Sequence, residues 1–149
     1  MGFDVEDRKE WTMHRHDVLD KHLATVPLFH DLSKKQLRLI SQLATELDEP
    51  AGTVLIQEGK PGHEFIVVIE GEIEIRQHDR VIGEHGAGSY VGEIALLEHC
   101  PRTATVVAKT PVRLEVIGQR EFSGLLAEVP ELSRQVKATA ARRLAEVAD

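Results

Sequence analysis

The chain has 149 residues, with 18 Lys and Arg against 25 Asp and Glu, which gives a formal net charge of −7 at pH 7. This length fits one domain, and 42% hydrophobic with 29% charged residues is typical of a globular protein. The acidic balance argues against binding to nucleic acid or to an anionic membrane, because either partner requires a basic face. Cys100 is the single cysteine, which excludes an intrachain disulfide and a cysteine-rich zinc site.

Helices are predicted in the first third of the chain. Residues 1–11 are charged and lack periodicity, so we expect a flexible N-terminus there. From residue 12 to residue 26 apolar side chains recur at helical spacing. Ser33 is a candidate N-cap that forms a capping box with Gln36, and the apolar stripe of this second helix is expected to continue to Leu47.

The middle of the chain has the two-residue period of strands. Short runs rich in β-branched residues alternate with turns that contain Gly or Pro. The predicted strands are 53–56, 65–69, 72–75, 80–82, 103–108 and 112–117. Many short strands with frequent turns are typical of a β-sandwich or a jelly roll.

Helical spacing returns after Gly118, and Pro130 can open a last helix because its missing N–H costs nothing in the first turn. We therefore expect one domain over residues 12–149, with helices over 12–47, a β core over 48–117 and C-terminal helices over 119–149.

The segment 92–106 lies within the β region but does not fit a strand. Residues 93–97 are good helix formers that follow a glycine, so a single helical turn is expected. The first N–H groups of such a turn lack helical partners and can bind an anion. Arg102 can bind phosphate oxygens through its guanidinium, and Glu93 can accept hydrogen bonds from hydroxyls. A ribose phosphate offers both kinds of group.

Residues 92–96 (Gly-Glu-Ile-Ala-Leu), followed by residues 101–104 (Pro-Arg-Thr-Ala), resemble the phosphate-binding cassette of the cyclic nucleotide-binding domains. The resemblance extends over roughly residues 26–148. It implies a mixed, mainly β fold, in which an eight-stranded β jelly roll is flanked by N-terminal and C-terminal α-helices. It also implies a cyclic nucleotide, cAMP or cGMP, as the ligand.

The resemblance assigns roles to several residues of the cassette. Gly92 would let the backbone approach the sugar, Glu93 would accept a hydrogen bond from the ribose 2′-hydroxyl, and Arg102 would pair with the cyclic phosphate. The backbone N–H groups of Ala95 and Thr103 would donate to the same phosphate. The expected ligand-binding residues are Gly92, Glu93, Ile94, Ala95, Arg102, Thr103 and Ala104.

Two features concern the base of the nucleotide. A hydroxyl at Thr103 permits cGMP, but cAMP binders of the family also carry Ser or Thr there, and we favour cAMP. Many members cover the base with an aromatic residue of a C-terminal helix, whereas this chain has no aromatic residue after Phe122. We expect an aliphatic residue of the last helix, or Arg142 or Arg143, to form the lid over the base.

The sequence thus predicts a cyclic nucleotide sensor that is not an enzyme and holds no metal. Its last helix, 130–149, would transmit binding through a second copy of the chain or a protein partner. With no signal peptide and no apolar run long enough for a bilayer, we expect it in the cytoplasm.

Two other hypotheses remain open. The jelly roll could be a scaffold that binds proteins without nucleotide. A metal-dependent cupin enzyme is the more distant one, because the eight histidines include no His-x-His pair in a predicted strand and are expected at the surface.

Overall fold

The computed structural model describes residues 23–148, so the segment 1–11 and most of the helix expected over 12–26 lie outside them. The helical elements are η1 (Pro27–Phe29), α2 (Lys34–Leu43), α3 (Glu93–Glu98), α4 (Gln119–Glu128) and α5 (Pro130–Ala148). The strands are β1 (Thr45–Glu49), β2 (Val54–Ile56), β3 (Glu64–Glu70), β4 (Ile73–Gln77), β5 (Arg80–His85), β6 (Tyr90–Val91), β7 (Thr105–Ala108) and β8 (Val112–Gly118).

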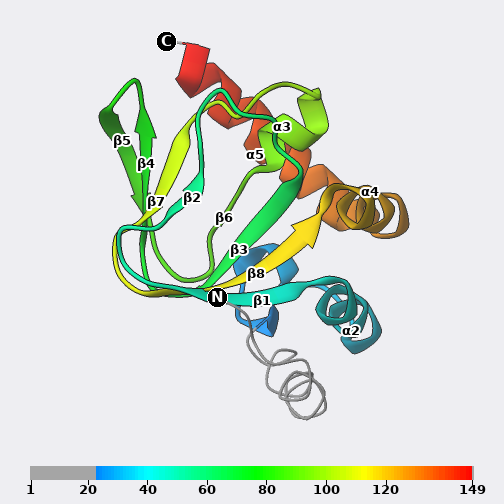
Figure 1. Ribbon diagram of the computed structural model, residues 1–149. Coiled ribbons are helices and arrows are strands. Elements are labelled where there is room, and N and C mark those ends of the chain that lie inside the picture. The colour runs from blue at the N-terminus through cyan, green and yellow to red at the C-terminus, as the bar shows by residue number, and fades with distance from the viewer. Residues whose placement is uncertain (1–22, 149) are drawn as a thin grey trace.

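The eight strands form two antiparallel sheets of four, with the orders β1-β8-β3-β6 and β2-β7-β4-β5. Figure 1 shows the helices gathered around the first sheet. The β4–β5 hairpin forms one edge of the second sheet, on the opposite side of the molecule from α2 and α4. The expected fold, an eight-stranded jelly roll with flanking helices, is confirmed.

Alternation along β3 divides the core into two parts. Ile66 and Val68 pack between the two sheets, whereas Phe65 and Val67 face the helices. Phe65 stacks on Phe122 of α4, with ring centroids 4.7 Å apart. A strand buried on both faces is continuously apolar, which explains the run from residue 65 to residue 69.

The N-terminus of α2 has the predicted capping box. The Ser33 hydroxyl accepts from the Gln36 backbone N–H at 3.1 Å, and the Gln36 side chain accepts from the Ser33 backbone N–H at 2.9 Å. The prediction that this helix extends to Leu47 is wrong, because α2 ends at Leu43 and Leu47 lies in β1 opposite Leu114. The spacing of Leu47 fits both a helix and a strand, and pairing with β8 decides between them.

Among residues 23–148, no helix combines the length and the apolar character that crossing a bilayer requires.

Candidate functional site

A pocket of about 480 Å³ lies between the β2-β7-β4-β5 sheet, the cassette and α5. All seven cassette residues expected to bind ligand line it, and so do both arginines expected to cover the base. Sequence reasoning missed much of the remaining lining, which comes from the second sheet, from β6 of the first sheet and from the end of α5: Ile56, Ile75, Gln77, Ile82, Gly83, His85, Val91, Val106 and Glu146.

Gly92 starts the cassette in a conformation that other residues rarely adopt. Its φ is +98°, and a Cβ at this position would lie 2.7 Å from the carbonyl oxygen of Glu64. The expected helical turn follows as α3 and ends at His99, which is left-handed, with the Cys100 N–H donating to the Ala95 carbonyl. The glycine therefore lets the chain turn from β6 into α3 directly against β3.

Arg102 is a buried cation, with 7% of its surface exposed. Its Nη1 donates to the Gly92 carbonyl at 3.0 Å and its Nη2 to the Glu64 carbonyl at 2.8 Å. Within the described part of the chain, no carboxylate lies at ion-pair distance from it. Burial lowers the pKa of Arg102, while the nearby charges of Glu64 and Glu93 act in the opposite direction.

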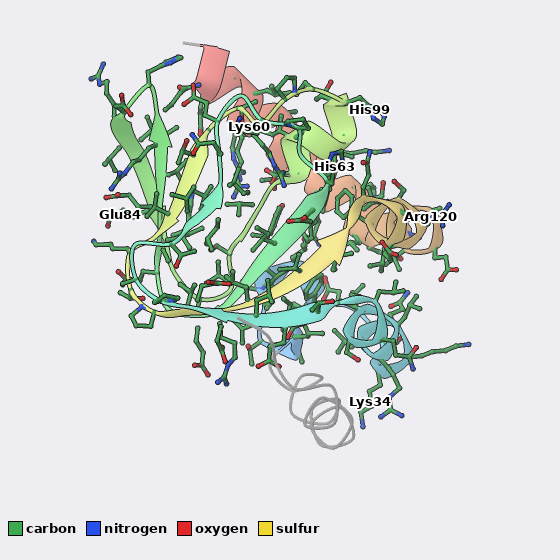
Figure 2. The ribbon with its side chains drawn as sticks, viewed as in Figure 1. Lys34, Lys60, His63, Glu84, His99 and Arg120 are labelled. Carbon is green, nitrogen blue, oxygen red and sulfur yellow. The ribbon has the colours of Figure 1, made fainter. Side chains whose placement is uncertain are left out.

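The loop between β2 and β3 holds the backbone of Arg102 from the other side. The Gly59 N–H donates to the Arg102 carbonyl at 2.8 Å, and the Arg102 N–H donates to the Lys60 carbonyl at 2.9 Å. Figure 2 shows Lys60 and His63 of this loop at the same end of the molecule as α3. A Cβ at Gly62 would overlap the Arg102 Nε atom, so the loop approaches the guanidinium as closely as glycine allows.

Glu93 is the most buried charged group of the pocket, with 1% of its surface exposed. Its Oε1 accepts from Arg143 Nη1 at 2.6 Å. Its Oε2 is buried and has no hydrogen-bond partner among the described residues. An unpartnered carboxylate oxygen carries a desolvation penalty, which a hydroxyl donor in the pocket would relieve.

Arg143 connects α5 to the cassette. Its Nη1 also donates to the Tyr90 carbonyl at 2.9 Å, and its guanidinium carbon lies 5.1 Å from the centroid of the Tyr90 ring. Burial raises the pKa of Tyr90, while the side chain of Thr139 on α5 acts in the opposite direction. Arg142, in contrast, is exposed at the edge of the pocket.

His85 departs from the surface position expected for the histidines. It lies on the pocket wall and is half-buried. Burial and the positive charge of Arg143 lower its pKa, against a smaller opposite effect of Glu146. Among residues 23–148, no group of three or more His, Cys, Asp and Glu side chains is arranged to hold a metal ion.

Comparison with known proteins agrees with this geometry. The family model of the cyclic nucleotide-binding domain matches residues 48–129, and the chain belongs to this family. It is 32% identical over 130 residues to a cAMP-dependent protein kinase regulatory subunit of Pyricularia oryzae, covering 86% of this chain and 33% of that protein. The chain thus spans about a third of the length of the curated relatives that it matches.

Solved structures share the fold at low sequence identity. Cyclic-AMP-bound PfPKA-R superposes with a TM-score of 0.81 at 22% identity, over 94% of this chain and 50% of that one. The regulatory subunit of a cAMP-independent protein kinase A of Trypanosoma brucei gives a TM-score of 0.80 at 22% identity, over 88% and 47% of the two chains. The same fold therefore occurs with and without a dependence on cAMP, and the residues of the site must decide the ligand.

Proposed function

We propose that this domain binds a cyclic nucleotide, with cAMP preferred over cGMP, and acts as a regulatory sensor rather than as an enzyme. The cyclic phosphate binds at Arg102, and the ribose 2′-hydroxyl donates to Glu93. Gly92, Ile94, Ala95, Thr103 and Ala104 complete the phosphate and sugar subsite, and no metal takes part.

One observation carries this proposal: among residues 23–148, the pocket holds a buried cation without a counter-ion next to a buried carboxylate whose second oxygen has no hydrogen-bond partner. Arg102 uses two of its five N–H donors on backbone carbonyls, which leaves donors for an anion. Glu93 needs a hydroxyl donor on the same ligand. A ribose cyclic phosphate carries the single negative charge and the hydroxyl together.

The preference for cAMP over cGMP has its own basis. It rests on the likeness to regulatory subunits of cAMP-dependent protein kinases over most of the chain. Thr103 lines the pocket, where its hydroxyl could also contact a guanine amino group. The ratio of the two affinities therefore measures what Thr103 contributes.

The helix α5 is the proposed output of the sensor. It contributes Arg142, Arg143 and Glu146 to the pocket, so a ligand there contacts this helix as well as the cassette. A ligand that binds one position of α5 better than another shifts the population toward that position. A protein partner or a second copy of the chain would then recognise the repositioned helix.

The alternative is a scaffold that binds a protein without nucleotide. The cAMP-independent relative gives this alternative weight, because it shares the fold at the level of 22% identity. Against it stand Arg102 and Glu93, whose burial without full partners is unfavourable in an empty pocket.

Calorimetric titration with cAMP and cGMP tests the proposal directly. The protein is first unfolded and refolded, so that any ligand carried through purification is removed. Saturable binding at low micromolar concentration or tighter supports the sensor. An absence of both heat and thermal stabilisation with either nucleotide would favour the scaffold.

A further inference from the structure

We propose that the ring of His85, on β5, packs against the purine base and provides the aromatic contact that the C-terminal helix of this chain lacks. The inference rests on the proposed function, since it concerns the base end of the same pocket. His85 belongs to the second sheet and not to the cassette, so the base would be recognised by a different part of the pocket lining.

The register of β5 directs His85 into the pocket. His85 pairs with Ile73, which is fully buried between the two sheets, whereas its neighbour Glu84 pairs with Glu74. Glu84 lies on the outer side of the hairpin, where it accepts from the Lys109 ammonium at 3.0 Å (Figure 2). Side chains alternate along a strand, so His85 and Gly83 share the inner face, and both line the pocket.

Gly83 adds no side chain to the inner face of β5 next to the imidazole. A Cβ at Gly83 would lie 3.8 Å from the His85 Nε2 atom and 4.0 Å from an Ile75 side-chain carbon, so the ring is within van der Waals distance of the space above the glycine. The strand thus presents a bare backbone and a ring next to each other. Among the described residues, His85 provides the single ring that lines this pocket.

The chemistry of the imidazole fits this role. Burial and Arg143 lower its pKa, so the ring is neutral near pH 7 and can stack on a base without the desolvation penalty of a cation. Stacking of bases on planar side chains is tolerant of base identity and contributes strongly to nucleotide binding. Arg143 is itself held by Glu93 and Tyr90, which leaves Arg142 as the arginine of α5 that can cover the opposite face of the base.

The test compares His85→Ala, His85→Phe and a matched control on the same strand. Val81→Ala truncates an exposed residue, 53% of whose surface is accessible and which pairs with Arg76 rather than lining the pocket. Titrations with cAMP and with cUMP report the contribution of the base, and thermal unfolding verifies that each variant is folded. We expect His85→Ala to weaken cAMP binding about tenfold, and cUMP binding less because its ring is smaller.

The outcomes separate the two proposals. Loss of cAMP affinity in His85→Ala, with near-complete retention in His85→Phe and in Val81→Ala, supports the stacking role. Unchanged cAMP affinity in a folded His85→Ala variant overturns it while the cyclic nucleotide site stands. Equal losses in His85→Ala and His85→Phe also overturn stacking. A wild-type protein that binds neither cAMP nor cGMP removes the proposed function and this inference with it.

Discussion

The carboxylate of Glu93 and the guanidinium of Arg143 meet at 2.6 Å, and this contact joins the first residue of α3 to α5. One oxygen of Glu93 is thereby held by the helix, and the other has no hydrogen-bond partner among the described residues. A ligand that hydrogen-bonds to Glu93 would therefore contact the same side chain that pairs with α5.

Removal of the Arg102 guanidinium is expected to have the largest effect on binding. Arg102→Ala should weaken cyclic nucleotide binding by about 2–5 kcal/mol, because the phosphate would enter a buried site without a cation. Titration calorimetry at constant salt measures this loss, and Arg134→Ala, an exposed arginine of α5, serves as the control. An unchanged dissociation constant for Arg102→Ala would contradict the assignment of the phosphate subsite.

Glu93→Gln should affect the sugar more than the phosphate. The amide oxygen can still accept from the 2′-hydroxyl but lacks the negative charge, so we expect a loss of about 1 kcal/mol, which is smaller than in Arg102→Ala. The distinctive result is a narrowed affinity ratio between cAMP and 2′-deoxy-cAMP, which lacks the donor. If the affinity ratio of cAMP to 2′-deoxy-cAMP is the same in the wild type and in Glu93→Gln, Glu93 does not recognise the ribose.

Loss of Arg143 should destabilise the fold without nucleotide. Arg143→Met leaves the Glu93 charge buried and unpaired, and we expect about 3 kcal/mol less stability to urea. This loss of stability is at the low end of the range for removing one partner of a buried ion pair, because 22% of the Arg143 side chain is exposed. Arg134→Met is the matched control. The double variant with Glu93→Gln should recover part of the loss, and strict additivity would show that the two groups are not coupled.

Gly62→Ala should affect binding more than folding. The added methyl overlaps the middle of the Arg102 side chain, which is fixed by two carbonyls, so the guanidinium must leave its position. We expect affinity for cAMP to fall at least tenfold with a modest drop in melting temperature. Gly86→Ala is the control, because no atom lies within 4 Å of a Cβ there. Equal affinities in the two variants would mean that Arg102 is not held as described.

His85 makes stability depend on pH. Its pKa in the folded protein is lowered from the ordinary value of 6.5, mainly by burial. The unfolded chain therefore binds a proton more readily, and the contribution of neutral His85 is present above pH 6.5 and lost as pH falls through the folded value. Urea denaturation between pH 7.5 and pH 5 should show a smaller decline in His85→Gln than in the wild type. An equal decline of the unfolding free energy in the wild type and in His85→Gln would show that His85 does not contribute to the pH dependence.

The local pattern of the sequence determined most of the elements. The capping box at Ser33 and Gln36 is formed by residues three apart, so it needs no tertiary context. The cassette is likewise a contiguous segment, and the residues that it contributes to the pocket are close in space because they are close in the chain. The strands β2 to β5, β7 and β8 were predicted near their observed positions because their burial imposes a period of two.

Only the tertiary structure decided the elements and contacts without a local signal. The strand β1 carries the polar sequence Thr-Glu-Leu-Asp-Glu and exists because β8 pairs with it. Arg143 meets Glu93 across 50 positions of sequence, and His85 reaches the pocket only when β5 closes the second sheet. The spacing of apolar residues and their helix or strand propensities show which face of an element is buried. They do not specify which distant group of the chain contacts that face. That choice is made by the closure of the two sheets around the cassette and by the packing of α5 against it.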